Sequence, residues 1–274
     1  MSVKKILLRA KKQVFGEMLG NNASLFQGEG FEFSELREYL YGDDVRKIDW
    51  KTTAKLGKPF VRIYNEEREL NVVTALMMGG STYFGTVRPK SELMSELVAL
   101  IGFSALKNGD RFTNIIFSDN LYSISKPTKK MFAIQDAVTK VNSFEMLGKE
   151  SNYREFVNTL YKRIRKKSLL FIISDFVGDI DLSILSKKHD VVAVIIRDRF
   201  EEDPAELGYI RLLDMEQYQS FEGSVGKNEL NKYKFFLQEN DRILYQHLKR
   251  NGVRYSKIYT HDEVYLKLAK LLGG

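Results

Sequence analysis

Three carboxylates that could do chemistry lie close together in the sequence: Asp43, Asp44 and Asp49. They belong to a charged and aromatic stretch from Gly28 to Gly57, GEGFEFSELREYLYGDDVRKIDWKTTAKLG. Carboxylates gathered at a turn can bind a hard cation, and a pair of them can serve as acid and base. The spacing therefore permits one functional interpretation, a metal-dependent hydrolase that uses Asp43, Asp44 and Asp49.

Two guanidinium groups in the same stretch favour a structural interpretation instead. Arg37 and Arg46 can each hold a carboxylate through two parallel hydrogen bonds, and their charge would repel a metal ion. We therefore expect both arginines to form ion pairs with Asp43 and Asp44. Trp50 is the only tryptophan of the chain, and we expect it to be buried beneath this network, where its removal would leave a large cavity.

Caps and breakers predict the elements that hold these residues. Ser34 can accept a hydrogen bond from a first-turn amide, which predicts a short helix that ends at Gly42. Asp43 predicts the start of a second helix that runs to about Leu56. Gly57 then ends that helix, because glycine adopts the left-handed conformation of a C-cap readily.

The same stretch carries a family resemblance. Residues from Gly30 to Ala54 match the run GEFxxLREYxxGDDxRxIDWxxTA, with Phe31 inserted after the glycine. This long motif resembles the signature of a bacterial and archaeal family known as domain of unknown function 58. Members of that family resemble von Willebrand factor A domains, and their genes commonly lie beside one for a MoxR-type AAA+ ATPase. The resemblance implies the fold and the partner class more than it implies an activity.

The composition is that of an ordinary globular protein. The chain has 274 residues, of which 43% are hydrophobic and 29% charged, and it can bury a substantial core. It contains no cysteine, which excludes disulfides and thiolate chemistry and suits the reducing cytoplasm where we expect the protein. No apolar run reaches the roughly 18 residues of a membrane span. The start of the chain also lacks the apolar core of a signal peptide.

The formal net charge of +7 raises nucleic acid as a partner. Basic residues gather in the ranges 4–12 and 162–167. The first range reads as an amphipathic helix with Leu7, Ala10 and Val14 on its apolar face. The second closes a helix, where cations favour the negative end of the dipole. A basic nucleic-acid-binding protein therefore stays a less favoured alternative.

Alternating apolar strands and amphipathic helices follow residue 70. Continuous apolar runs predict parallel strands that are buried on both faces, at Leu70–Met78, Leu169–Ile173 and Val191–Ile196. The alternation predicts an α/β fold with a doubly wound, mostly parallel sheet, and the resemblance implies that it is of the von Willebrand factor A type. We expect residues 1–69 to form an N-terminal extension with the signature and residues 70–274 to form the sheet domain.

Ligands of such a sheet bind beyond the carboxyl ends of its strands. We therefore expect one crevice to be lined by the loops that follow Met78, Val141 and Ser174.

The resemblance implies a Mg²⁺ site in this crevice, built from Asp-x-Ser-x-Ser after the first strand, a Thr from a second loop and an Asp from a third. Met77 and Gly79 stand where the first two ligands would be, while Ser81 keeps its hydroxyl. Ser151 can stand in for the Thr, and Asp175 matches the third-loop Asp. Together Ser81, Ser151 and Asp175 would bind Mg²⁺ weakly at best, because one carboxylate recovers little of the ion's dehydration cost.

Other catalytic motifs are absent from the sequence. It has no GxxxxGK[ST] loop, no GxGxxG at a strand-to-helix turn, no HExxH and no GxSxG. His189, His247 and His261 are far apart in the chain, so we expect them at surface or capping positions.

We therefore expect a non-enzymatic interaction module without catalytic residues. The resemblance implies that it acts with a MoxR-type AAA+ ATPase in the assembly or activation of a target protein. The expected partner-binding rim of the degenerate metal site consists of Ser81, Tyr83, Phe84, Ser151, Asp175 and Phe176.

Overall fold

The chain divides into two compact units. The computed structural model describes residues 1–15, 33–64, 69–145, 147–204, 208–213 and 220–272. One unit, here called the sheet unit, comprises Met1–Phe26 with Leu70–Gly274, and the other, the signature unit, comprises Gln27–Glu69. The second segment of the sheet unit begins at Leu70. The first residues, however, do not belong to an extension, because α1 (Val3–Phe15) packs in the core of the sheet unit.

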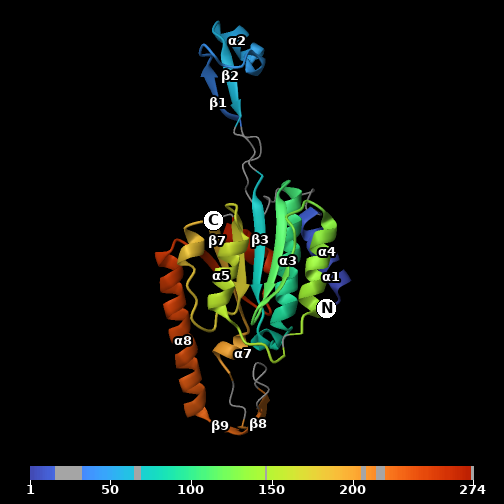
Figure 1. The fold of residues 1–274 in the computed structure, drawn as a ribbon, viewed down its shortest axis with the longest axis vertical. Helices are drawn as coiled ribbons and strands as arrows, with labels where there is room; N and C mark the ends of the chain where they lie inside the picture. Colours follow the sequence, from blue (N-terminus) through green and yellow to red (C-terminus); the bar gives the residue numbers. More distant parts are fainter. Residues whose placement is uncertain (16–32, 65–68, 146, 205–207, 214–219, 273–274) are drawn as a thin grey trace. The chain divides into compact units, whose positions relative to one another are not determined.

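Six strands form the sheet, in the order β10-β7-β6-β3-β4-β5 (Figure 1). Their bounds are β3 Asn71–Met77, β4 Arg111–Phe117, β5 Leu121–Ile124, β6 Leu169–Ser174, β7 Asp190–Arg197 and β10 Arg254–Tyr259. All neighbouring pairs are parallel except β4 and β5. Counted along the chain, this is the 3-2-1-4-5-6 order of a doubly wound sheet, which reverses between β3 and β6. The predicted α/β fold with a mostly parallel sheet is confirmed.

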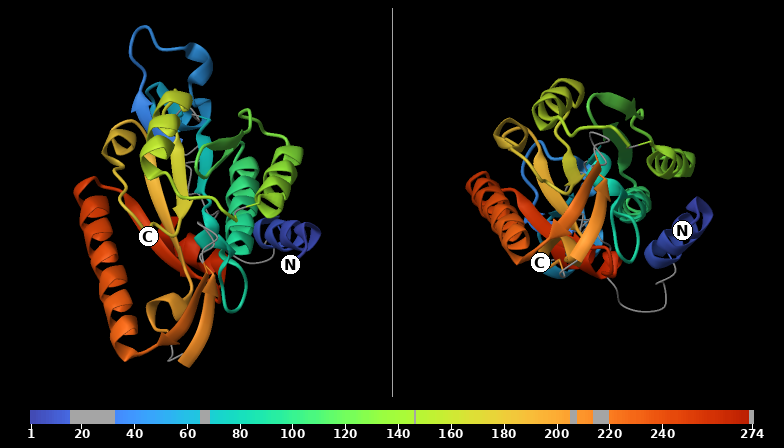
Figure 2. Two further views of the ribbon diagram at one scale, coloured as in Figure 1. Left: turned by 60° about the horizontal axis from the view of Figure 1, so that its bottom comes forward. Right: turned by 90° about the horizontal axis from the view of Figure 1, so that it is seen from below.

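Helices cover both faces of this sheet (Figure 2). One core cluster joins α1, α3, α4 and α9 to one face, and a second joins α5, α6 and α8 to the other. Their bounds are α3 Lys90–Lys107, α4 Met131–Ser143, α5 Tyr153–Arg163, α6 Ser183–Ser186, α8 Lys227–Arg250 and α9 Val264–Leu272. A short α7 (Arg199–Glu202) and a hairpin of β8 (Gly208–Leu213) and β9 (Ser220–Val225) connect β7 to α8. Among the described residues, no helix is long and apolar enough to cross a membrane.

The apolar run of β3 is explained by burial on both sides. Val72 and Leu76 belong to the first core cluster, whereas Val73 and Met77 belong to the second, because successive side chains of a strand point to opposite faces. Both faces of β3 are covered by helices, so no position of the strand can be polar without a partner.

The signature unit is built on a two-stranded antiparallel sheet. Its elements are β1 Phe33–Glu38, the 3₁₀ turn η1 Val45–Lys47, α2 Trp50–Leu56 and β2 Phe60–Tyr64. The helix predicted to start at Ser34 is therefore wrong. The backbone of this segment pairs with β2. A prediction from capping residues uses only neighbours in the sequence, so it cannot detect a partner strand that is distant in the chain.

The second predicted helix is divided into two pieces. Ile48 has an extended backbone and bridges to Val61 in β2, which interrupts the helix. Asp44 therefore caps η1 and Asp49 caps α2, in place of the predicted cap Asp43. Gly57 ends α2 as predicted, with a left-handed φ of 70°.

Candidate functional site at the carboxyl edge of the sheet

The strand order reverses between β3 and β6, and the loops beyond these two strands meet at one edge. The loop after β3 enters the 3₁₀ turn η2 (Gly80–Tyr83), and its Gly80 amide donates to the carbonyl of Lys149 at 3.1 Å. Lys149 lies in the loop between α4 and α5. The loop after β6 begins with Asp175, which accepts a hydrogen bond from Ser81. The three loops expected to line one crevice therefore lie together.

Asp175 is the centre of this site and is only 2% exposed. Its Oδ2 accepts from Ser81 Oγ at 2.6 Å and from Lys90 Nζ at 3.2 Å, and its Oδ1 accepts from the Tyr153 hydroxyl at 3.3 Å. Burial alone would raise the pKa of Asp175, but the Lys90 charge, the Ser81 hydrogen bond and the Arg197 charge bring it below its ordinary value. Asp175 is thus a buried, ionised carboxylate.

A buried ammonium group neutralises this carboxylate. Lys90 is the first residue of α3 and is 0% exposed. Its Nζ lies 3.2 Å from Asp175 Oδ2 and 2.6 Å from Oε1 of Glu201 in α7. Burial disfavours the charged form, but the two carboxylates outweigh burial and raise the pKa of Lys90. A permanent positive charge therefore lies inside the crevice.

A second buried cation extends the cluster toward α8. Arg197, the last residue of β7, donates to the backbone carbonyl of Asp175 and, at 2.8 Å, to Asp241 Oδ1. Lys257 of β10 donates to Asp241 Oδ2 at 2.7 Å and to Glu202 Oε1 at 2.5 Å. Each cation thus has carboxylate or carbonyl partners. We call Lys90, Asp175, Arg197, Glu201, Glu202, Asp241 and Lys257 the buried charge network.

The residues present do not fit the Mg²⁺ site that the resemblance implies. Met77 packs in the second core cluster, and Gly79 offers no side chain. Both oxygens of Asp175 already accept hydrogen bonds, and the Lys90 ammonium beside them repels a second cation. Mg²⁺ also needs about six hard oxygens. In the part of the chain that the structure describes, no group of three or more His, Cys, Asp or Glu could hold a metal ion.

The expected partner-binding rim separates into exposed and buried residues. Tyr83 and Phe84 are 47% and 36% exposed, and the Phe84 ring lies 6.1 Å from that of Phe200. Phe176 is instead completely buried. Its left-handed φ of 52° directs the side chain into the second core cluster, where it stacks on Tyr153. The prediction that Phe176 contacts a partner is therefore corrected, and Asp175 is equally inaccessible.

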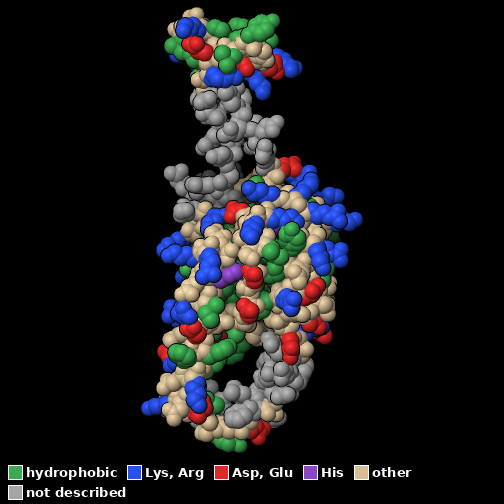
Figure 3. Space-filling model, turned by 60° about the vertical axis from the view of Figure 1, so that its left-hand side comes forward, with side chains coloured by type: hydrophobic (Ala, Val, Ile, Leu, Met, Phe, Trp, Pro, Cys, Tyr) green, Lys and Arg blue, Asp and Glu red, His purple; other side chains and the backbone are tan. Residues whose placement is uncertain are grey.

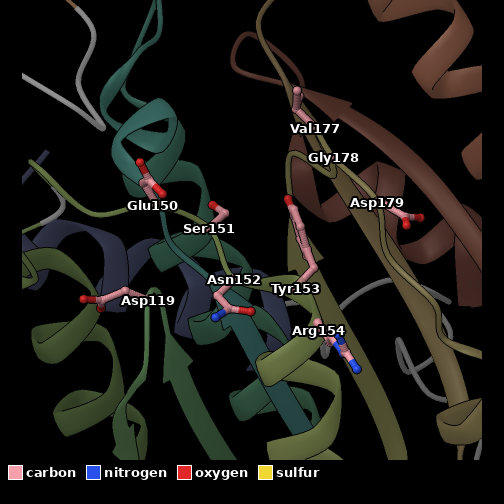
Figure 4. A pocket seen from close by; sticks show the side chains of 9 residues that line it. All are labelled: Asp119, Glu150, Ser151, Asn152, Tyr153, Arg154, Val177, Gly178 and Asp179. Atoms are coloured by element: carbon pink, nitrogen blue, oxygen red, sulfur yellow. The ribbon is translucent and has the colours of Figure 1, made fainter. Parts of the chain in front are cut away.

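An open pocket of ≈ 420 Å³ adjoins the buried charge network (Figure 4). Tyr153 joins the two, because it lines the pocket and donates to Asp175. Burial raises the pKa of Tyr153 well above its ordinary value, so its hydroxyl stays a neutral donor. Ser151, the expected stand-in for the Thr ligand, lies in the wall of this pocket. The full lining is Asp119, Glu150, Ser151, Asn152, Tyr153, Arg154, Val177, Gly178 and Asp179.

The ion pairs expected in the signature unit are confirmed. Arg37 Nη2 lies 2.9 Å from Asp43 Oδ1. Arg46 binds both oxygens of Asp44, each at 3.0 Å. Asp49 accepts from two amides at the start of α2 and from the Thr52 hydroxyl. The three carboxylates therefore serve three different local contacts, and these contacts do not converge on one cation position.

Trp50 contradicts the expected burial. Its side chain is 68% exposed at the first position of α2. This short helix buries none of its residues, so no core lies beneath it to receive an indole. The size and rarity of tryptophan favoured burial in the sequence, but the unit is too small to supply the surrounding surface.

Lys90, Arg197 and Glu201 are site residues that the sequence analysis missed. The sequence held one signal for Lys90. A lysine directly after Pro89 at a helix start is unfavourable, because its charge is repelled by the positive end of the helix dipole, so its presence there suggests a specific role. Arg197 and Glu201 lie in the charged run RDRFEE that follows the apolar strand β7. Such charges usually mark a solvated loop, so their burial was not visible locally.

A family model described as "Protein of unknown function DUF58" matches residues 35–235. Uncharacterized proteins of Mycobacterium bovis and Mycobacterium tuberculosis are 28% identical over 219 residues, which cover 76% of this chain and 68% of each relative. The match takes in most of the signature unit and the sheet from β3 to β7.

Two solved structures are also similar in part. The conserved hypothetical protein BatB from Bacteroides thetaiotaomicron aligns with a TM-score of 0.46 and 14% identity over 74% of this chain and 97% of that one. An aerotolerance-related membrane protein from Bacteroides fragilis aligns with a TM-score of 0.45 and 13% identity over 74% and 96% of the two chains.

Proposed function

The chain belongs to the DUF58 family of proteins of unknown function, and on that premise we propose that it is a non-enzymatic protein-interaction module. Its proposed partner is a MoxR-type AAA+ ATPase, with which it acts in the assembly or activation of a target protein. The partner class comes from the resemblance of the signature, since genes of that family commonly lie beside one for such an ATPase. The proposed docking surface is the crevice of a von Willebrand factor A-like sheet.

One observation carries the proposal: two aromatic side chains are exposed beside the polar pocket of the crevice, while Lys90, Asp175 and Arg197 are paired inside it. Tyr83 lies in η2, whose Ser81 binds Asp175, and Phe84 follows directly as its C-cap; both are exposed. Val177, in the pocket wall, is 38% exposed. Exposed aromatic side chains near a polar pocket are typical of protein contact sites, where large rings supply most of the binding energy.

The protonation states in the crevice support a role without catalysis. An acid or base works best when its pKa lies near the working pH. Here the pKa of Asp175 is lowered, whereas the pKa values of Lys90 and Tyr153 are raised. All three groups are therefore moved away from neutrality, which is the opposite of what proton transfer at neutral pH requires.

The one face of the sheet unit drawn in Figure 3 gives no support to nucleic acid as the main partner. On the face of the sheet unit drawn in Figure 3, carboxylates lie among the lysine and arginine side chains. A duplex-binding face instead gathers cations into a patch or stripe. Aromatic docking to a protein therefore remains the better supported proposal.

The test is calorimetry with a purified MoxR-type ATPase from the same organism. The wild type should bind, and the affinity should survive EDTA in a complex formed with nucleotide-preloaded ATPase. The double variant Tyr83→Ala/Phe84→Ala should lose at least about tenfold in affinity, because both rings would leave the interface. Phe132→Ala is the matched control, since Phe132 is 73% exposed on α4 and should not matter.

Equal affinity of the double variant and the wild type would contradict docking through η2. Loss of binding in EDTA, restored by Mg²⁺ alone, would contradict a metal-independent surface. Asp175→Ala and Phe176→Ala are poor probes of docking, because both side chains are buried and their removal tests folding.

A further inference from the structure

We propose that Lys90 is a built-in cation, whose ammonium group takes the place of a divalent metal ion in the crevice and closes the site to metals. The inference concerns the crevice of the proposed function, but it does not depend on any partner. Its failure and that of the proposed function are therefore separable.

The position of the ammonium group is that of a bound cation. Its nitrogen lies 2.6 Å from Glu201 Oε1 and 3.2 Å from Asp175 Oδ2, two oxygens contributed by separate elements. Ser81 Oγ donates a hydrogen bond to the same Asp175 oxygen at 2.6 Å. Two carboxylates and a hydroxyl are hard oxygen ligands of the kind that Mg²⁺ or Mn²⁺ prefers. Lys90 supplies one positive charge to this oxygen set, and that charge repels a second cation.

The ammonium group is held there against two opposing effects. Its burial is complete, and removing a charge from water is costly unless the charge is paired. It also lies at the start of an 18-residue helix, whose dipole disfavours a cation, and Pro89 before it provides no side-chain cap. Among the described residues, the two carboxylates that accept from its ammonium group compensate for these costs. The ion pairs with Asp175 and Glu201 are therefore what fixes Lys90 in the crevice.

Removal of the Lys90 ammonium group should have the opposite effect on metal binding, and this can be tested. Without the ammonium group, Asp175 and Glu201 would be two carboxylates beside the space it leaves, with Arg197 as the remaining nearby cation. Two like charges in such surroundings repel each other and favour uptake of a counter-ion. A truncated Lys90 should therefore turn the crevice into a divalent cation site.

The experiment compares the wild type, Lys90→Ala and Lys90→Ala/Asp175→Asn, using Mn²⁺ alone as the probe. The wild type should bind no stoichiometric Mn²⁺ in calorimetry, and its melting temperature should not respond to the ion. Lys90→Ala should bind about one Mn²⁺ per chain, with a rise of about 5 °C in melting temperature at saturation. The double variant should lose this response, because it lacks one ligand charge.

Lys107→Ala is the matched control, since Lys107 lies at the exposed end of the same helix and should leave the protein indifferent to Mn²⁺. Should Lys90→Ala fail to fold during expression, it is refolded from urea with Mn²⁺ or with EDTA. Recovery only with Mn²⁺ supports the proposal, and equal recovery or equal failure in the two buffers overturns it. Stoichiometric binding of Mn²⁺ by the wild type that is lost in Asp175→Asn would overturn it as well.

Discussion

Two highly charged regions of the molecule use the same kinds of side chain in opposite surroundings. In the sheet unit, the Lys90–Asp175 pair is 0% and 3% exposed at its side chains. In the signature unit, the Arg46–Asp44 pair is 89% and 37% exposed. Charges attract much more strongly away from water, and each buried charge is costly once it loses its partner. Breaking the buried charge network should therefore cost much stability. Breaking the ion pairs of the signature unit should cost little, although its charges lie closer together in the sequence.

This difference also shows why charge density in a sequence is a poor guide to a site. The signature places acidic and basic residues next to one another, so their pairing can be foreseen from spacing alone. The partners of Lys90 are far away in the chain, at Asp175 and Glu201, and only the fold brings them together. Local pairs lie on the surface of a small unit, while distant pairs meet in the core.

The largest expected effect is that of Asp175→Asn. This isosteric change leaves the buried Lys90 and Arg197 without one of their charge partners. We expect the free energy of unfolding of the sheet unit to fall by about 3–5 kcal/mol, as for other broken buried pairs. Urea unfolding followed by circular dichroism measures it. Asp190→Asn is the control, because Asp190 pairs with Arg254 on the surface of the same unit. Equal costs for the two variants would refute the comparison.

A buried ionisable group without a partner sharpens the comparison. His189 was expected at a surface or capping position, but it is 4% exposed. Neither of its ring nitrogens has a hydrogen-bond partner among the described residues. Burial, together with the nearby Lys188 charge, lowers the pKa of His189 to about 4. The group is therefore neutral in the folded protein and must be protonated on unfolding below its ordinary pKa.

The pH dependence of stability follows from this shift. The unfolded chain binds the proton below about pH 6.5, so stability is fully present above that pH and is lost as the pH falls toward about 4. Between pH 7 and pH 5, the lowered pKa of His189 should reduce the free energy of unfolding by about 2 kcal/mol. His189→Leu should remove this part of the slope in urea titrations, whereas His261→Leu should keep it. An unchanged slope in His189→Leu would show that other groups cause the loss.

Trp50→Ala should have a much smaller effect. A buried indole would leave a cavity and cost several kcal/mol, but the observed side chain is 68% exposed. We expect a change within about 0.5 kcal/mol in the stability of the signature unit, as for other surface substitutions. Iodide quenching of the single tryptophan checks the premise directly. Quenching should be nearly as strong in the native protein as in urea. Much weaker quenching in the native protein would show that Trp50 is buried after all.

The fold of the sheet unit was largely predictable, and the physical reason is periodicity. Parallel strands such as β6 are buried on both faces, so a continuous apolar run suffices to find them. The crevice followed from topology alone, since loops at the carboxyl edge of such a sheet lie together. The strand β1 was not predictable from its own residues, because pairing with β2 decides its conformation. Phe176 was placed at the rim because nothing in the sequence reveals its left-handed backbone.

The smallest expected effect concerns the ion pair of Asp44 and Arg46. Both oxygens of Asp44 are bound by Arg46, and this hydrogen bonding lowers the pKa of Asp44. Geometry of this quality would make a strong pair in the core, but here water competes for every donor and acceptor. We therefore expect a double-mutant cycle of Asp44→Ala and Arg46→Ala to give no measurable coupling at physiological salt.

Hydrogen exchange of the amides in β1 and β2 is the suitable measurement for this cycle, because it reports opening of the signature unit separately from the sheet unit. Part of the cost of Asp44→Ala will come from the lost cap of η1 and will persist in the Arg46→Ala background. That part cancels in the cycle, which isolates the ion pair. A coupling that appears in low salt and vanishes as salt is added would fit an exposed pair. A coupling that resists salt would mean that the pair is shielded from water by something bound over it, and the signature unit would then rank with the crevice as an interaction surface.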